Sequence, residues 1–146
     1  MKKLGSLILV AAIGYAVYTT QRRPAESPAT QSTTADSTDV LARAFAQKQS
    51  NVQVQATGVV ERMLSDDNDG SRHQRFIVRL SSGQTILIAH NIDLASRVSP
   101  LAVGDEIQFS GEYEWNNQGG VVHWTHRDPG GKHEAGWIRR DGQLFQ

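Results

Sequence analysis

The side chains best suited to chemistry in this 146-residue chain are its five histidines, which all fall between residues 73 and 133. They are His73, His90, His123, His126 and His133. Histidine titrates near neutral pH, and its neutral ring is a common metal ligand. The chain contains no cysteine, which excludes disulfides, thiolate nucleophiles and Cys-ligated metals. Any metal must therefore be held by histidine, carboxylate or carbonyl groups.

One histidine is predicted to face a carboxylate across a hairpin. If Asn116–Gly119 closes a hairpin in which Trp115 pairs with Gly120, Glu112 lies directly opposite His123 on the outer face. A carboxylate beside an imidazole orients the ring and can prepare it for acid/base catalysis or metal binding. The same pair could equally be a surface ion pair without chemistry.

A second histidine group follows in the turn-forming run after residue 126. His123 and His126 are three residues apart, which places them on opposite faces of a regular strand unless the strand ends near Thr125. His126, Asp128 and His133 could then converge from one loop as a metal site. Such ligands suit Zn²⁺, Mn²⁺ or Fe²⁺, with Mg²⁺ a further candidate. The alternative is a loop whose histidines bond only to backbone groups.

Basic and polar residues mark a third candidate region. His73, Arg75 and Arg79 share one face of a predicted strand and could bind an anionic group. His90 and Asp93 lie at the end of the next strand, where Asp93 could bind a ligand or simply cap a helix.

The elements that must position these residues are short strands with alternating apolar residues. Strands are predicted at residues 52–60, 74–80, 84–89, 106–115 and 121–125, with a short helix in 91–101 and a final strand or two around 136–138 and 144–145. Three strands, a short helix and two more strands is the order of an OB-fold, a five-stranded Greek-key barrel. The fold class predicted is thus all-β and OB-fold-like, with another small antiparallel barrel or sandwich as the alternative.

The first 50 residues differ in composition from the remainder. Residues 1–20 carry two lysines and then an apolar run, the layout of a signal peptide or membrane anchor. No small-x-small triplet closes the run, so an uncleaved anchor is favoured. Residues 21–50 predict a flexible tether. It ends in a short amphipathic helix with Val40, Leu41, Ala44 and Phe45 on one face, behind caps at Ser37 and Asp39. We expect an exported protein of the periplasm or cell envelope, held by the inner membrane.

Residues 51–146 hold nine Arg and Lys against twelve Asp and Glu, a net charge of −3 with neutral histidines. The strongly basic surface typical of nucleic-acid binders is missing, which argues against long nucleic acids as partners.

Several strings in this domain resemble those of a small bacterial family of unknown function. They include Ala89–Ala95 (AHNIDLA), Gly111–Asn116 (GEYEWN) and Gly119–His126 (GGVVHWTH). The resemblance covers roughly residues 52–146. It implies an exported bacterial protein of undescribed activity and supplies no catalytic residues.

Two functions fit these residues. The first is a metal-assisted hydrolase of phosphodiesters, nuclease-like, with His123 and Glu112 as base or ligand and His126 and His90 as further ligands or acid. Arg75 or Arg79 would then clamp developing negative charge.

The second is a non-catalytic OB-fold module that binds a sugar, a nucleotide or another small polar ligand. Trp115, Trp124 and Trp137 would supply its stacking surfaces.

Overall fold

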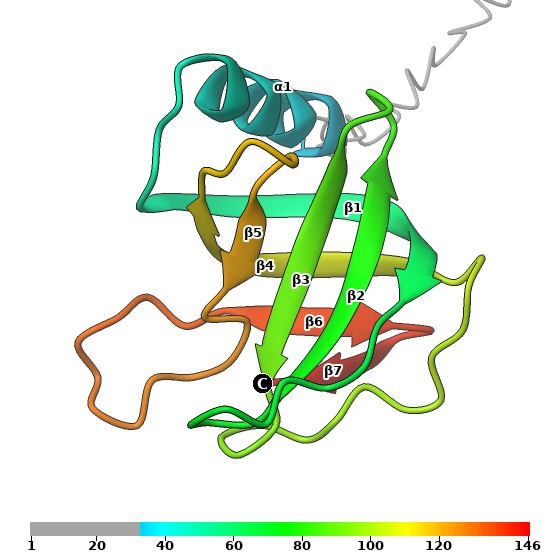
Figure 1. Ribbon diagram of the computed structural model, residues 1–146, viewed down its shortest axis with the longest axis vertical. Helices are drawn as coiled ribbons and strands as arrows, with labels where there is room; N and C mark the ends of the chain where they lie inside the picture. Colours follow the sequence, from blue (N-terminus) through cyan, green and yellow to red (C-terminus); the bar gives the residue numbers. More distant parts are fainter. Residues whose placement is uncertain (1–32) are drawn as a thin grey trace, which may run out of the picture.

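Alternating apolar residues build the β-strands of this domain, shown in Figure 1 as a computed structural model. The structure describes residues 33–146. The elements are α1 Thr33–Ala46, β1 Val52–Met63, β2 His73–Leu80, β3 Thr85–Asn91, β4 Glu106–Glu114, β5 Val121–His123, β6 Trp137–Arg140 and β7 Gln143–Phe145.

The first five strands close into a barrel. The strand order is β1-β2-β3-β5-β4, and β4 pairs back onto β1. Strands β3 and β5 run parallel, whereas the other neighbours are antiparallel. Figure 1 shows β2 and β3 crossing in front of β1 and β4. The all-β, OB-fold-like barrel predicted from the strand pattern is confirmed.

The barrel interior is filled by the apolar residues of each alternating strand. Phe76, Ile88, Phe109, Tyr113 and Val122 are fully buried, and they come from four different strands. Residues between them face outward because successive side chains of a strand point to opposite sides. The outer face therefore carries His73, Arg75 and Arg79 of β2, Glu112 of β4 and His123 of β5, whereas His90 of β3 is buried.

The chain after the barrel adds two short strands. β6 pairs with β4, and β7 pairs with β6, so the hairpin extends the sheet beyond the barrel. Its buried residues, Ile138 and Phe145, join the core. The final strands predicted around residues 136–138 and 144–145 are confirmed.

The predicted amphipathic helix is present as α1, which packs against β1. Leu41 and Ala44 are buried in the core, whereas Phe45 is 36% exposed. The helix begins at Thr33, so Ser37 and Asp39 lie inside it and the predicted caps are wrong. The proposed signal or anchor in residues 1–20 lies outside the described residues. Within residues 33–146 no helix is long and apolar enough to cross a bilayer.

The short helix predicted within residues 91–101 does not form. Asn91 instead accepts a hydrogen bond from the Asp93 amide on its side-chain Oδ1, which makes a turn, and the chain continues without regular structure. The buried Gln74 side chain bonds both the N–H and the C=O of Val98, at 2.9 and 3.0 Å. These tertiary bonds satisfy the backbone groups that a helix would have paired.

Candidate functional site

The β4–β5 hairpin places Glu112 directly opposite His123, as the sequence predicts. The connecting turn is held by Asn116, whose Oδ1 accepts hydrogen bonds from the amides of Gln118 and Gly120 at 2.8 and 3.0 Å. Gly120 has a φ of 99°, and a Cβ there would lie 2.1 Å from the Tyr113 ring. Only glycine fits this position, so the turn fixes the register that brings Glu112 to His123.

His123 places one ring nitrogen between two carboxylates. Its Nε2 lies 3.6 Å from Glu112 Oε1 and 3.9 Å from Glu114 Oε1, and this atom is buried without a hydrogen-bond partner. Burial lowers the pKa of His123, while the two glutamates oppose that shift. The burial shift favours the neutral ring, the form in which an imidazole nitrogen can bind a metal.

Glu112, Glu114 and His123 together could hold a metal ion, because one ligand atom from each lies within 4.8 Å of the others. Glu114 was not among the site residues predicted from the sequence. The sequence pattern could have indicated Glu114, since residues 112 and 114 share one face of an alternating strand.

His133 orients the central carboxylate of this group. Its Nε2 lies 2.8 Å from Glu112 Oε2, and its ring stacks on Trp124 with centroids 4.2 Å apart and planes 7° apart. One face of Trp124 is thereby covered. The Glu112 carboxylate has one oxygen fixed by His133 and the other turned toward His123.

Asp128 shapes the loop that delivers His133. Its two carboxylate oxygens accept hydrogen bonds from the amides of Gly130, Lys132 and His133 at 2.7–2.9 Å. These backbone bonds, led by Gly130, lower the pKa of Asp128. In this structure Asp128 holds the loop together, and its role as a metal ligand stays a prediction.

The predicted metal set of His126, Asp128 and His133 is not assembled among the described residues. His126 is 3% exposed, and its Nδ1 lies 2.7 Å from the Arg127 carbonyl. The chain turns sharply at Trp124, which has a φ of 53°. This turn ends β5 and brings His126 and His123 to the same cleft.

That cleft has a volume of about 460 Å³ and borders the metal-ligating group through His123. It is lined by Ser71, His73, Asn91, Leu94, His123, Trp124 and His126. His73 Nδ1 lies 2.8 Å from the Ser71 carbonyl. In the neutral tautomer in which the nitrogen that contacts a carbonyl carries the proton, Nε2 of His73 and of His126 would be the acceptor.

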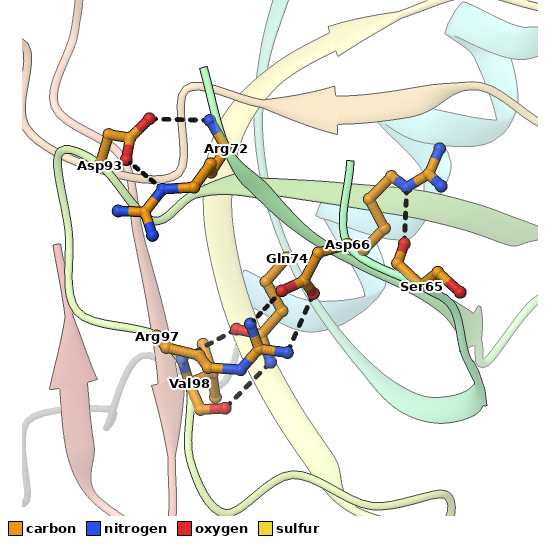
Figure 2. Close-up of polar contacts among 8 residues, drawn as sticks. Ser65, Asp66, Arg72, Gln74, Asp93, Arg97 and Val98 are labelled. Carbon is orange, nitrogen blue, oxygen red and sulfur yellow. Dashed lines mark hydrogen bonds and ion pairs between the residues drawn. The ribbon is translucent and has the colours of Figure 1, made fainter. Parts of the chain in front are cut away.

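Ion pairs brace the loops around the cleft (Figure 2). The carboxylate of Asp93 binds the amide and the Nε of Arg72 at 2.8 and 2.7 Å, and Asp66 makes two bonds with Arg97 at 2.6 and 2.9 Å. The Arg72 bonds lower the pKa of Asp93. Asp93 holds two loops together here, and its role in ligand binding stays a prediction.

His90, predicted as an acid or a ligand, lies inside the barrel. It is fully buried, and its Nδ1 and Nε2 lie 2.8 Å from Thr125 Oγ1 and 3.1 Å from the Ser96 carbonyl. Burial lowers its pKa to about 4. Both nitrogens are engaged inside the protein, which leaves none for a substrate or an ion.

Three further predicted residues lie away from the cleft. Arg79 forms an ion pair with Glu61. Trp115 packs on the core, and Lys48 Nζ lies 5.4 Å from the centroid of its ring. Arg75 lines a different cleft and donates from Nε to the Ser65 carbonyl at 3.0 Å. The structure therefore gathers Glu112, His123 and His133 with His73, Trp124 and His126, and leaves the predicted arginine clamp outside.

A family model described as "Protein of unknown function (DUF3465)" matches residues 25–146. A search of curated proteins found no match.

Proposed function

The chain belongs to the DUF3465 family of proteins of unknown function, and we propose that it is a metal-dependent hydrolase. Glu112, Glu114 and His123 would hold one divalent transition-metal ion. The adjacent cleft would hold the substrate.

The observation that carries this proposal is the buried, unpaired Nε2 of His123 between two carboxylate oxygens. An unpaired buried polar atom is costly and calls for an explanation. Two ligand atoms about 2.1 Å from a zinc ion at the tetrahedral angle lie roughly 3.4 Å apart. The observed 3.6 and 3.9 Å are too long for hydrogen bonds and close to this spacing.

The ligand set favours a borderline ion with an open position. One imidazole and two carboxylates suit Zn²⁺ or Mn²⁺ better than Mg²⁺, which prefers oxygen ligands and retains several waters. Three protein ligands are also the pattern of catalytic zinc sites, which leave the fourth position to water. When bound, such an ion would lower the pKa of a coordinated water to about 7.

The residues of the cleft supply the remaining chemistry. The Nε2 atoms of His73 and His126 would be the acceptors in the tautomers that donate to the Ser71 and Arg127 carbonyls, and would take a proton from the attacking water. Trp124 packs on His133 and so helps to fix Glu112.

The charge of the cleft favours a phosphodiester as the substrate class. Within the described part of the chain, its lining includes neither Arg nor Lys. A phosphomonoester dianion would lack a countercharge there, whereas a diester carries a single negative charge. The proposed site of action is the cell envelope, with the first 20 residues as the inner-membrane anchor.

The alternative function is a non-catalytic module for a sugar, a nucleotide or another small polar ligand. The cleft supports it, because its volume of about 460 Å³ is within the usual range for small-molecule sites and its lining combines polar residues with Trp124.

Elemental analysis of the purified full-length protein after loading with Zn²⁺ or Mn²⁺ tests the metal site. We expect one equivalent in the wild type, and its loss in Glu114→Gln and His123→Ala. Glu106→Gln is the matched control, because Glu106 lies on the same strand and is exposed. A wild type that retains no metal would contradict the proposal.

An activity assay separates the two functions. Bis(4-nitrophenyl) phosphate is the diester probe, and 4-nitrophenyl phosphate is the monoester control. Turnover of the diester that disappears in His123→Ala supports the hydrolase. Stoichiometric metal without turnover of either compound favours the binding module.

A further inference from the structure

A second cleft lies on the outer face of the barrel and has a different character. Its volume is about 240 Å³, and it lies among β2, β3, the start of the β1–β2 loop and the β4–β5 turn. Leu64, Ile77 and Leu87 supply its apolar wall, while Arg75, Asn116 and Gln118 supply its polar groups. The cleft therefore combines an apolar surface with hydrogen-bond donors.

Arg75 is the charged group of this cleft. Among the described residues no carboxylate lies within ion-pair distance of it, whereas Arg79 on the same strand pairs with Glu61. The Nε of Arg75 donates to the Ser65 carbonyl. That bond fixes the side chain and leaves the two terminal nitrogens free to bind an anion in a forked geometry.

Asp66, an acidic residue that interacts with Arg75 electrostatically, is already paired with another arginine. Asp66 feels the charge of Arg75, but its carboxylate makes two hydrogen bonds with Arg97 (Figure 2). Arg75 therefore keeps a positive charge that no described residue pairs directly.

Asn116 provides a second donor with a fixed orientation. Its Oδ1 accepts two backbone hydrogen bonds of its own turn, so its Nδ2 carries both free protons. No hydrogen bond joins this Nδ2 to another described residue. Asn116 lines this cleft from the β4–β5 turn, and Arg75 lines it from β2.

We propose that this cleft binds the carboxylate or phosphate group of a small ligand with an apolar body. The Arg75 guanidinium and the Asn116 amide would bind the anion, and Ile77 and Leu87 would contact the body. Arg75 lies two strands from His123, the proposed metal ligand on β5, roughly 10 Å at the usual strand spacing. The two clefts share no lining residue, so this is a separate site that does not depend on the proposed metal centre.

Titration of ¹⁵N-labelled full-length protein with benzoate and with phenyl phosphate tests this site and distinguishes the two anions. We expect saturable shifts of the Asn116 side-chain amide and the Gln118 and Gly120 backbone amides with at least one of them. Arg75→Gln should weaken binding by about tenfold or more, since it removes a charged donor. Arg79→Gln is the matched control on the same strand and should leave the affinity unchanged.

Asn116→Asp guards against a trivial loss of folding. Aspartate keeps the oxygen that accepts the two backbone bonds of the turn, but it replaces the free donor with a negative charge. We expect a folded protein that no longer binds either probe. The proposal is overturned if neither probe shifts these amides, or if Arg75→Gln binds as well as the wild type. Retained binding in the metal-site variant His123→Ala would show that the two sites are independent.

Discussion

Glu112 joins two histidines, because its Oε2 lies 2.8 Å from His133 Nε2 while its Oε1 lies 3.6 Å from His123 Nε2. The first contact is a hydrogen bond, and the second is too long to be one. One carboxylate oxygen is thus fixed by the protein, and the other shares a buried space with an unpaired nitrogen. A carboxylate that is oriented through one oxygen keeps the other oxygen available to bind a metal ion.

His133→Phe should weaken metal binding while the fold is retained. Phenylalanine keeps an aromatic ring against Trp124 but cannot donate to Glu112, so the carboxylate loses its fixed orientation. Loss of such an orienting hydrogen bond typically costs about 10- to 100-fold in metal affinity. Competition with a chelator measures the affinity. An unchanged affinity would mean that His133 does not position Glu112.

The stability of the protein should fall on acidification because of His90. Its pKa is about 4 in the folded state, against 6.5 ordinarily. As the pH falls, His90 therefore takes up a proton in the unfolded chain before it does so in the folded protein. Its contribution to the free energy of unfolding is complete above pH 6.5 and is lost toward pH 4. From about pH 7 to about pH 5 the free energy of unfolding should drop by about 2 kcal/mol.

Urea unfolding at the two pH values measures that drop, and NMR assigns it to His90. The ring protons of His90 should not shift between about pH 8 and about pH 5, because the ring stays neutral over that range. A His90 titration centred near 6.5 would contradict the prediction.

Gln74→Met should destabilise the protein by about 3 kcal/mol. Methionine has a similar volume, but it leaves the buried N–H and C=O of Val98 without partners. Gln53→Met is the matched control, because Gln53 makes one 3.3 Å hydrogen bond to Ser110 and is half-buried. That control should cost less than about 1 kcal/mol in urea unfolding. Equal losses in the two variants would refute the assigned role of Gln74.

Gly120→Ala should disrupt the hairpin that pairs Glu112 with His123. The new Cβ would overlap the ring of Tyr113, which is fully buried and cannot move aside. We expect a loss of more than about 3 kcal/mol. Gly131→Ala also meets a positive φ, 63°, but finds open space, so it should cost only about 1 kcal/mol. Comparable unfolding midpoints for the two variants would contradict this account.

The local parts of the site could be predicted from the sequence. The Asn- and Gly-rich turn and the alternation of residues 106–115 predict the barrel strand and the opposition of Glu112 and His123, which the structure confirms. The stripe of Val40, Leu41 and Ala44 likewise predicts α1. These features depend on residues close together in the chain, so their spacing carries the information.

The helix expected in residues 91–101 shows where local reasoning fails. Nothing near Val98 in the sequence indicates that Gln74, 24 residues earlier, will satisfy its backbone. The same holds for His90, whose nitrogens contact Thr125 and Ser96 once the barrel has closed.

The sequence by itself determined which residue types are available and which face of each strand they occupy. Only the tertiary structure decided their partners: Glu61 neutralises Arg79, Asp128 folds the loop that carries His133 to Glu112, and Arg75 is left unpaired over a second cleft. The physical reason is that charge pairing and desolvation depend on distances of a few ångströms between segments remote in sequence. Strand periodicity fixes a direction for each side chain, but barrel closure fixes its neighbours.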